Sequence, residues 1–148
     1  MMRRVRSGYG VMVIALVAVL AACHHTPAEQ QIRQAIDAGA KAAEATDAGD
    51  FGDIISDDFD GGEGRFDRRR LLGMLRLMHL RGEHLSVVMG PVSVEPRGDR
   101  YVATFTVTLG SGNSRLLPDH LGVYSVTTAW RHEDGEWLCY NARWKRRL

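Results

Sequence analysis

The chain has 148 residues, of which 45% are hydrophobic and 25% are charged. This length and this share of apolar residues fit one globular domain, and they exclude a multidomain enzyme or a disordered chain. Nineteen basic residues against 18 acidic ones leave a formal net charge of +1, so we expect no nucleic-acid partner. Two cysteines are too few for a disulfide-stabilised scaffold.

Residues 1–22 have the three parts of an export signal. Three arginines within the first six residues precede an uncharged apolar run over 11–20, and polar residues follow at 24–26. An apolar run of about ten residues rises only about 15 Å as a helix, whereas the hydrocarbon core of a bilayer is about 30 Å thick. We therefore expect a signal peptide that is removed, not a permanent membrane span.

The end of this segment, Leu20-Ala21-Ala22-Cys23, resembles the bacterial lipobox, in which small residues precede a cysteine that is lipidated and becomes the mature N-terminus. A cysteine suits this chemistry because its thiolate is nucleophilic enough to take a diacylglyceryl group as a thioether. The sequence predicts lipidation at Cys23, a linker over 23–27 and a mature domain over 28–148. A plain signal peptide that happens to contain a cysteine is the alternative.

Lipidation at Cys23 predicts a protein anchored to the cell membrane, because two or three acyl chains hold a protein stably at a bilayer. Resemblance to other lipoproteins implies that an aspartate after the cysteine favours the inner membrane, and His24 stands there instead. We expect the outer membrane, on the side facing the periplasm. Once Cys23 is acylated, Cys139 has no partner thiol, and we interpret it as a small buried side chain in a strand.

Helical spacing dominates the first half of the mature chain. Apolar residues recur every three or four positions from Ile32 to Ala43, which predicts an amphipathic helix over 28–48 with small residues on its inner face. A short second helix is predicted over 50–56, followed by an extended segment at 57–59. The glycines at 61–64 indicate a small hairpin.

Asp67 is a suitable N-cap for a third helix, which Gly82 ends, and from there the apolar period changes to two. An interruption is expected at Gly90-Pro91, since proline cannot donate to a strand ladder. Asp134-Gly135 is typical of a hairpin turn. Four strands of an antiparallel meander are predicted, over 85–95, 101–109, 121–132 and 136–145. The whole is an α+β domain.

This order of elements resembles the nuclear transport factor 2-like (SnoaL-like) superfamily over about residues 28–147. The resemblance rests on Asp57-Asp58-Phe59, Trp130-Arg131, Gly135-Glu136-Trp137, Asn141 and Trp144. It implies a cone in which N-terminal helices pack on a curved antiparallel sheet, with a pocket at the open end. Members include isomerases, dehydratases and cyclases as well as non-catalytic binding or dimerisation modules, so the fold does not decide the function.

The residues do not assemble a known catalytic set. Resemblance to ketosteroid isomerases would require a tyrosine donor on the first helix, and residues 28–48 contain none. Asp57 or Asp58 could supply a carboxylate at the cone mouth, although an exposed acidic pair is the simpler interpretation. No two histidines stand at a metal-ligand spacing on one helix, so we expect neither a metal nor another cofactor.

Aromatic residues on the last two strands are the best candidates for a pocket wall. Tyr124 and Trp130 have like parity on one strand, and Tyr140 and Trp144 on the next, so each pair can share one face of the sheet. Core packing is the alternative. The candidate pocket-lining residues are Asp58, Phe59, Tyr124, Trp130, Tyr140 and Trp144, and no catalytic residue is assigned.

The sequence thus predicts a membrane-anchored lipoprotein of the cell envelope whose domain is a non-catalytic module. Its expected partners are the membrane, a small apolar ligand and a second copy of the chain in a homodimer. The alternative is an isomerase or dehydratase that uses Asp58 or a pocket histidine as general base. A cavity without an inward-facing ionisable group would argue against that enzyme.

Overall fold

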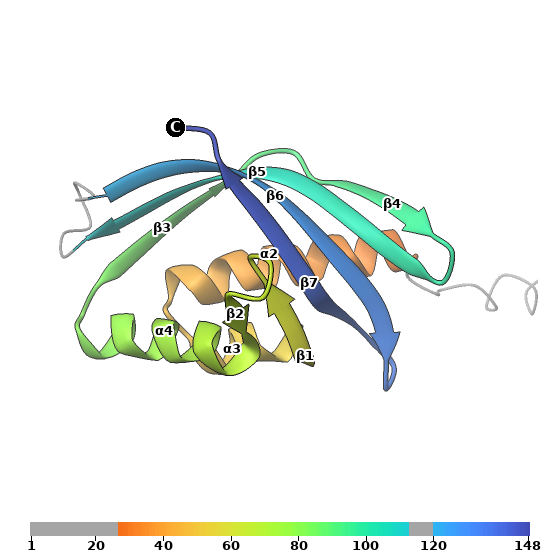
Figure 1. Ribbon diagram of the computed structural model, residues 1–148, viewed down its shortest axis with the longest axis horizontal. Coiled ribbons are helices and arrows are strands. Elements are labelled where there is room, and N and C mark those ends of the chain that lie inside the picture. The colour runs from red at the N-terminus through yellow and green to blue at the C-terminus, as the bar shows by residue number, and fades with distance from the viewer. Residues whose placement is uncertain (1–26, 113–119) are drawn as a thin grey trace, which may run out of the picture.

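The computed structural model describes residues 27–112 and 120–148. Three helices, α2 (Ala28–Glu44), α3 (Ala48–Asp53) and α4 (Arg68–Leu80), lie on one side of a curved sheet (Figure 1). The strands are β1 (Ile55–Gly61), β2 (Phe66–Asp67), β3 (His84–Met89), β4 (Ser93–Arg97), β5 (Arg100–Gly112), β6 (His120–Glu133) and β7 (Glu136–Arg146). The predicted signal peptide and Cys23 lie outside the described residues. No helix within them is long and apolar enough to cross a membrane.

The first two helices end earlier than their sequence pattern predicts. α2 ends at Glu44, and not at 48, because Thr46 adopts a left-handed backbone with φ of 50°. The side chain of Asp47 then accepts hydrogen bonds from the N–H groups of Gly49 and Asp50, at 2.9 and 3.0 Å. This cap starts α3 at Ala48, two residues before the predicted position.

The seven strands form one mixed sheet in the order β2-β1-β7-β6-β5-β3, and β4 also pairs with β5. β5, β6 and β7 form the predicted antiparallel meander. β1 and β2 form the extended segment and the small hairpin that the sequence predicts around 57–64. The parallel pairing of β1 with β7, which joins this hairpin to the sheet, was not predicted. The predicted α+β fold class is confirmed, with helices packed on a curved sheet.

The strand predicted over 85–95 is split in two at Gly90-Pro91. β3 and β4, on either side of the split, both pair with β5. The N–H of Gly90 donates to the carbonyl oxygen of Thr106 at 2.8 Å, so the chain stays close to β5 while it changes direction. The break therefore lets one segment cover two parts of the long β5.

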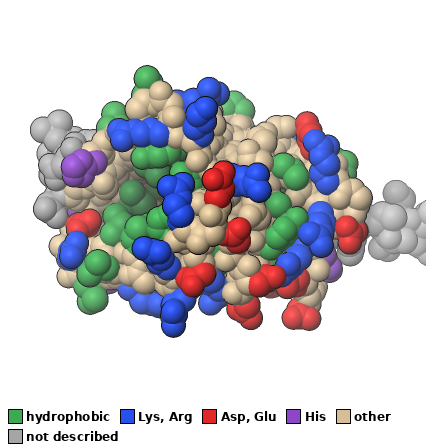
Figure 2. Space-filling view, viewed as in Figure 1, with side chains coloured by type: hydrophobic (Ala, Val, Ile, Leu, Met, Phe, Trp, Pro, Cys, Tyr) green, Lys and Arg blue, Asp and Glu red, His purple; other side chains and the backbone are tan. Residues whose placement is uncertain are grey.

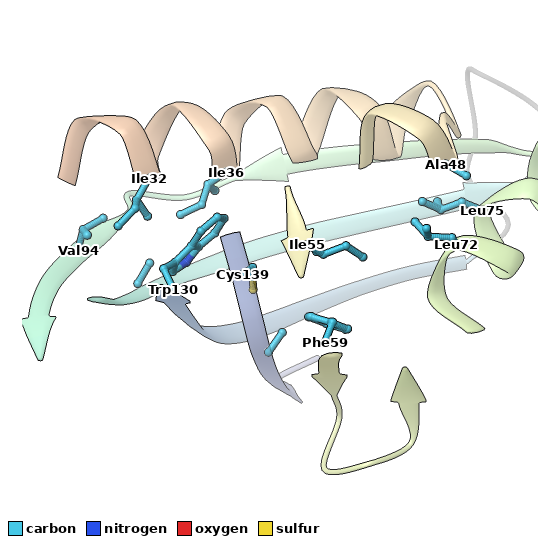
Figure 3. Packing of buried hydrophobic residues seen from close by; sticks show 12 residues of the cluster. Ile32, Ile36, Ala48, Ile55, Phe59, Leu72, Leu75, Val94, Trp130 and Cys139 are labelled. Carbon is cyan, nitrogen blue, oxygen red and sulfur yellow. The ribbon is translucent and has the colours of Figure 1, made fainter. Parts of the chain in front are cut away.

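The hydrophobic core fills the space between the helices and the concave face of the sheet. Trp130 on β6 lies beneath Ile32 and Ile36 of α2, with Cys139 of β7 beside it (Figure 3). Leu72 and Leu75 join the same cluster from α4. The two longer helices are thus held to the sheet by apolar contacts, and the sheet curves around them.

Candidate ligand-binding cavity

A cavity of about 280 Å³ opens between the helices and the concave face of the sheet. Figure 2 shows hydrophobic side chains around a hollow in the left half of the view, between the strands above it and α4 below it, with basic side chains near its edge. The helices contribute Ile36, Gly39, Ala40, Ala43, Phe51, Leu71, Met74 and Leu75 to its wall. The sheet contributes aliphatic and aromatic side chains from β1, β3, β5, β6 and β7.

The few polar groups in this wall are already bonded within the protein. The indole Nε1 of Trp130 donates to Thr128 Oγ1 at 2.8 Å, and that hydroxyl donates to the carbonyl oxygen of Ala103 at 3.3 Å. The thiol of Cys139 lies 3.4 Å from the carbonyl oxygen of Asn141. A ligand in the cavity therefore gains contact with apolar surface and finds no free polar partner among these side chains.

Among the described residues of the cavity wall, Cys139 is the only titratable group. Burial raises the pKa of its thiol to about 12, because a thiolate would lose its hydration there. The thiol therefore stays protonated near neutral pH and is a weak nucleophile. Its place in β7 and its burial agree with the interpretation of Cys139 as a small buried side chain.

Three of the six predicted pocket residues lie in the wall. Phe59 of β1, Trp130 of β6 and Trp144 of β7 all line the cavity. Tyr124 has the same parity as Trp130, but its ring packs over Gly122, outside the lining residues. These three rings come from three different strands, and Phe105 of β5 and Phe51 of α3 add to the aromatic part of the wall.

Tyr140 does not share a face with Trp144, because a bulge interrupts the pairing of β6 and β7. Ala129 is opposite Asn141 and the next residue, Trp130, is opposite Cys139, so Tyr140 is an extra residue on β7. The bulge resets the inward and outward alternation along the strand. Equal parity therefore does not place Tyr140 and Trp144 on the same face, and Tyr140 lies on the outer face.

Asp58 also lies on the outer face, although Phe59 beside it points into the cavity. Its carboxylate forms an ion pair with Arg131, whose guanidinium lies 5.1 Å from the ring centroid of Tyr140. The hydrogen bond from Arg131 lowers the pKa of Asp58 below its usual value. The guanidinium of Arg100 also lies over the Tyr140 ring, 5.0 Å from its centroid. Asp58 is thus an ionised partner in a surface cluster and does not reach the cavity.

None of the described histidines lines the cavity either. His79 Nδ1 lies 3.1 Å from Thr46 Oγ1 at the end of α4, and the His132 ring packs 5.2 Å from Trp137. Within residues 27–112 and 120–148, no three histidine, cysteine or acidic side chains are grouped so that they could hold a metal ion. The described part of the cavity contains no general base of the kind that an isomerase or dehydratase uses.

Sequence reasoning missed most of the helical wall. The sequence feature that indicates this wall is the run of small residues on the inner face of α2. A side chain on Gly39 would collide with Ile54 and approach Phe51. Ala40 and Ala43 follow on the same face and line the cavity. Small side chains let α3 pack closely on α2, and they also leave space that no side chain fills.

Solved structures with this architecture are numerous, although no family model and no curated protein matches the chain. A nuclear transport factor 2-like protein from Cytophaga hutchinsonii has a TM-score of 0.67 at 13% identity, covering 82% of this chain and 100% of that one. A nuclear transport factor 2-like protein of unknown function from Pseudomonas putida has a TM-score of 0.64 at 18% identity, covering 80% of this chain and 85% of that one.

Bd1075 from Bdellovibrio bacteriovorus also matches, with a TM-score of 0.67 and 10% identity. The match covers 80% of this chain but only 41% of Bd1075, so the matched region is less than half of that protein. Identities this low establish the fold alone. The protein has the nuclear transport factor 2-like fold, with a curved sheet around its helices.

Proposed function

We propose that this protein is a membrane-anchored lipoprotein of the cell envelope, lipidated at Cys23, whose domain binds a small apolar ligand without catalysis. The observation that carries the ligand proposal is the cavity of about 280 Å³, whose wall is apolar and whose polar atoms are bonded internally. The lipobox-like segment that ends at Cys23 carries the anchor proposal.

The cavity favours binding over chemistry because the described part of its wall offers no carboxylate or imidazole to move a proton. Its volume lies near the lower limit of about 300–1,000 Å³ for small-molecule sites. Each buried CH₂ group contributes about 0.8 kcal/mol. A ligand with one or two apolar rings, or a short alkyl chain, therefore fits the cavity by size and gains its affinity from burial alone.

The ligand proposal is tested with naphthalene as a neutral apolar probe, added to the mature chain from residue 23 carrying Cys23→Ser. Binding to the folded state should raise the midpoint of thermal unfolding, measured by circular dichroism. Ala43→Leu places a larger side chain in the cavity and should abolish most of this rise. Ala38→Leu, at an exposed position on the same helix, is the matched control and should retain it.

An equal rise in the two variants would mean that naphthalene binds elsewhere, and no rise in the parent chain would contradict the ligand proposal. Native mass spectrometry of the protein extracted from its host then identifies a retained small molecule. The same spectrum reports whether the chain forms the homodimer that the sequence analysis predicts.

The anchor proposal is tested separately by labelling cells with radioactive palmitate. We expect the parent chain to be labelled and to fractionate with the outer membrane. Cys23→Ser should lose the label and leave the membrane fraction or be mislocalised. If palmitate still enters the Cys23→Ser variant, or if the mature chain begins at another residue, the anchor proposal is wrong.

A further inference from the structure

The side of α4 that faces away from the core exposes apolar side chains. Leu77 is 46% exposed and Leu80 is 82% exposed, whereas Leu72 and Leu75 on the opposite side are buried. Residues three apart on a helix lie on one face, so Leu77 and Leu80 form a short apolar stripe. Within the described residues this stripe touches solvent, which is the usual mark of a surface that binds a partner.

Arginines flank this stripe on both sides. By helical spacing, Arg69 and Arg76 lie along one edge and Arg70 and Arg81 along the other. All four are exposed. The helix has no acidic residue anywhere between its first and last positions.

The acidic residues next to α4 cancel only part of this charge. Asp67 precedes the helix, where its carboxylate accepts a hydrogen bond from the backbone N–H of Arg70 at 2.7 Å and caps the N-terminus. Glu83 follows the helix, 3.7 Å from Arg81. The helix holds no acidic residue that could pair with Arg69 or Arg76. Neither arginine takes part in an ion pair among the described residues.

The same helix forms one wall of the cavity. Leu71, Met74 and Leu75 line it, and Met74 is also 45% exposed, which places Met74 at the rim. Figure 2 shows basic and hydrophobic side chains together along the lower left of the molecule, where Figure 1 places α4. The exposed stripe and the opening of the cavity therefore lie on adjacent sides of one helix.

We infer that α4 docks on an anionic membrane surface. Leu77 and Leu80 enter the boundary between headgroups and acyl chains, and the arginines beside them lie among the lipid phosphates. A helix with an exposed apolar stripe between basic residues has the composition that binds in the plane of such an interface. This contact goes beyond the proposed anchor and ligand, and it brings the rim of the cavity to the lipid, where apolar molecules are concentrated.

Charge and shape favour a membrane over an acidic protein partner. The stripe is the convex side of a helix and needs no matching groove on its partner when that partner is a fluid lipid surface. Each arginine near an anionic surface contributes about 1 kcal/mol, or about fivefold in binding, so several together give appreciable affinity. An acidic protein that binds α4 is the competing outcome of the experiment.

The experiment measures binding to vesicles with the mature chain from residue 23 that carries Cys23→Ser, so that no acyl chain can anchor it. This chain contains every described helix and strand. We expect it to sediment with vesicles of phosphatidylcholine that contain about one third phosphatidylglycerol, to bind pure phosphatidylcholine more weakly, and to be released by salt. Leu80→Ser should weaken binding about tenfold, and Arg76→Gln about fivefold.

Two control variants lie on the sheet, away from α4. Leu121→Ser removes a side chain on β6 that is 61% exposed, and Arg143→Gln removes an exposed charge on β7. Both should bind vesicles as the parent chain does, and circular dichroism should show that all variants are folded.

The inference is wrong if the parent chain binds neither vesicle, or if the α4 variants and the sheet variants change binding equally. Crosslinking of α4 to an acidic protein in the host, combined with no vesicle binding, would assign the surface to that protein instead. Neither result affects the naphthalene measurement or the palmitate label. Failure of this inference is therefore distinct from failure of the proposed function.

Discussion

The indole of Trp130 donates a hydrogen bond to the hydroxyl of Thr128, two residues earlier on the concave side of β6, at 2.8 Å. Both side chains are buried and both line the cavity. The hydroxyl of Thr128 in turn donates a hydrogen bond to the carbonyl oxygen of Ala103 on β5, at 3.3 Å. These two hydrogen bonds pair the indole N–H, the hydroxyl and the carbonyl oxygen with one another, so none of them is left to bind a ligand and the wall is effectively apolar.

Replacing Thr128 with valine tests these hydrogen bonds. Thr128→Val keeps the shape of the side chain but leaves the buried indole N–H without an acceptor, which should lower the free energy of unfolding by about 1–3 kcal/mol. Urea denaturation measures the change. Thr128→Ser retains the hydroxyl and should cost less than Thr128→Val. Equal losses in the two variants would mean that packing of the methyl group, not the hydrogen bond, is what Thr128 contributes.

Cys139 should resist alkylation in the folded protein. Because burial raises the pKa of its thiol to about 12, almost no thiolate is present at pH 8. In the Cys23→Ser chain, where Cys139 is the only cysteine, we expect iodoacetamide to react at least about a hundredfold more slowly than in denaturant. Mass spectrometry follows the reaction. Rapid labelling of the native chain would contradict the burial of Cys139 in the cavity wall.

The same thiol predicts a loss of stability at high pH. The unfolded thiol ionises near pH 8.5, whereas the folded thiol stays protonated until about pH 12. The unfolded state therefore releases a proton first, so stability is intact below about pH 8.5 and falls as the pH rises above it. Urea denaturation gives the free energy of unfolding at each pH. Above about pH 8.5 this free energy should fall more steeply with pH for Cys23→Ser than for Cys23→Ser with Cys139→Ala. Parallel pH profiles would show that Cys139 titrates normally.

Asp58→Asn should leave ligand binding unchanged. The carboxylate of Asp58 lies on the outer face beside Arg131, and its side chain is 64% exposed, so the substitution should cost less than about 1 kcal/mol of stability. The lowered pKa of Asp58 means that its contribution is present above pH 4 and is lost as the pH falls through the folded-state value. Thermal shifts with naphthalene compare Asp58→Asn with the parent. If naphthalene no longer raised the unfolding midpoint of Asp58→Asn, Asp58 would have to contribute to the cavity.

Gly62→Ala should be more damaging than Gly64→Ala. Both glycines have positive φ, at 60° and 82°, so an alanine at either position is strained by about 1–2 kcal/mol. A Cβ on Gly62 would also lie 3.0 Å from the Trp144 ring, whereas a Cβ on Gly64 meets nothing within 4 Å. Urea denaturation gives the difference between the variants, which reports the packing of Trp144. Equal costs would indicate that Trp144 moves freely.

Local patterns in the sequence were sufficient to predict the helices, the hairpins and the antiparallel meander of β5, β6 and β7. A period of 3.6 or 2 is a property of one segment, and turns such as Asp134-Gly135 depend on the backbone freedom of their own residues. Phe59, Trp130 and Trp144, which the sequence placed in the pocket, do line the cavity wall.

The outer positions of Asp58 and Tyr140, the parallel pairing of β1 with β7 and the volume of the cavity were decided only by tertiary structure. The bulge that turns Tyr140 outward exists because β7 has one more residue than β6 at that point of the pairing, and no single strand reveals it. Asp58 turns outward because pairing with β7 puts Phe59 on the concave face. A cavity is space left between helices and strands distant in sequence, so it depends on how they pack together.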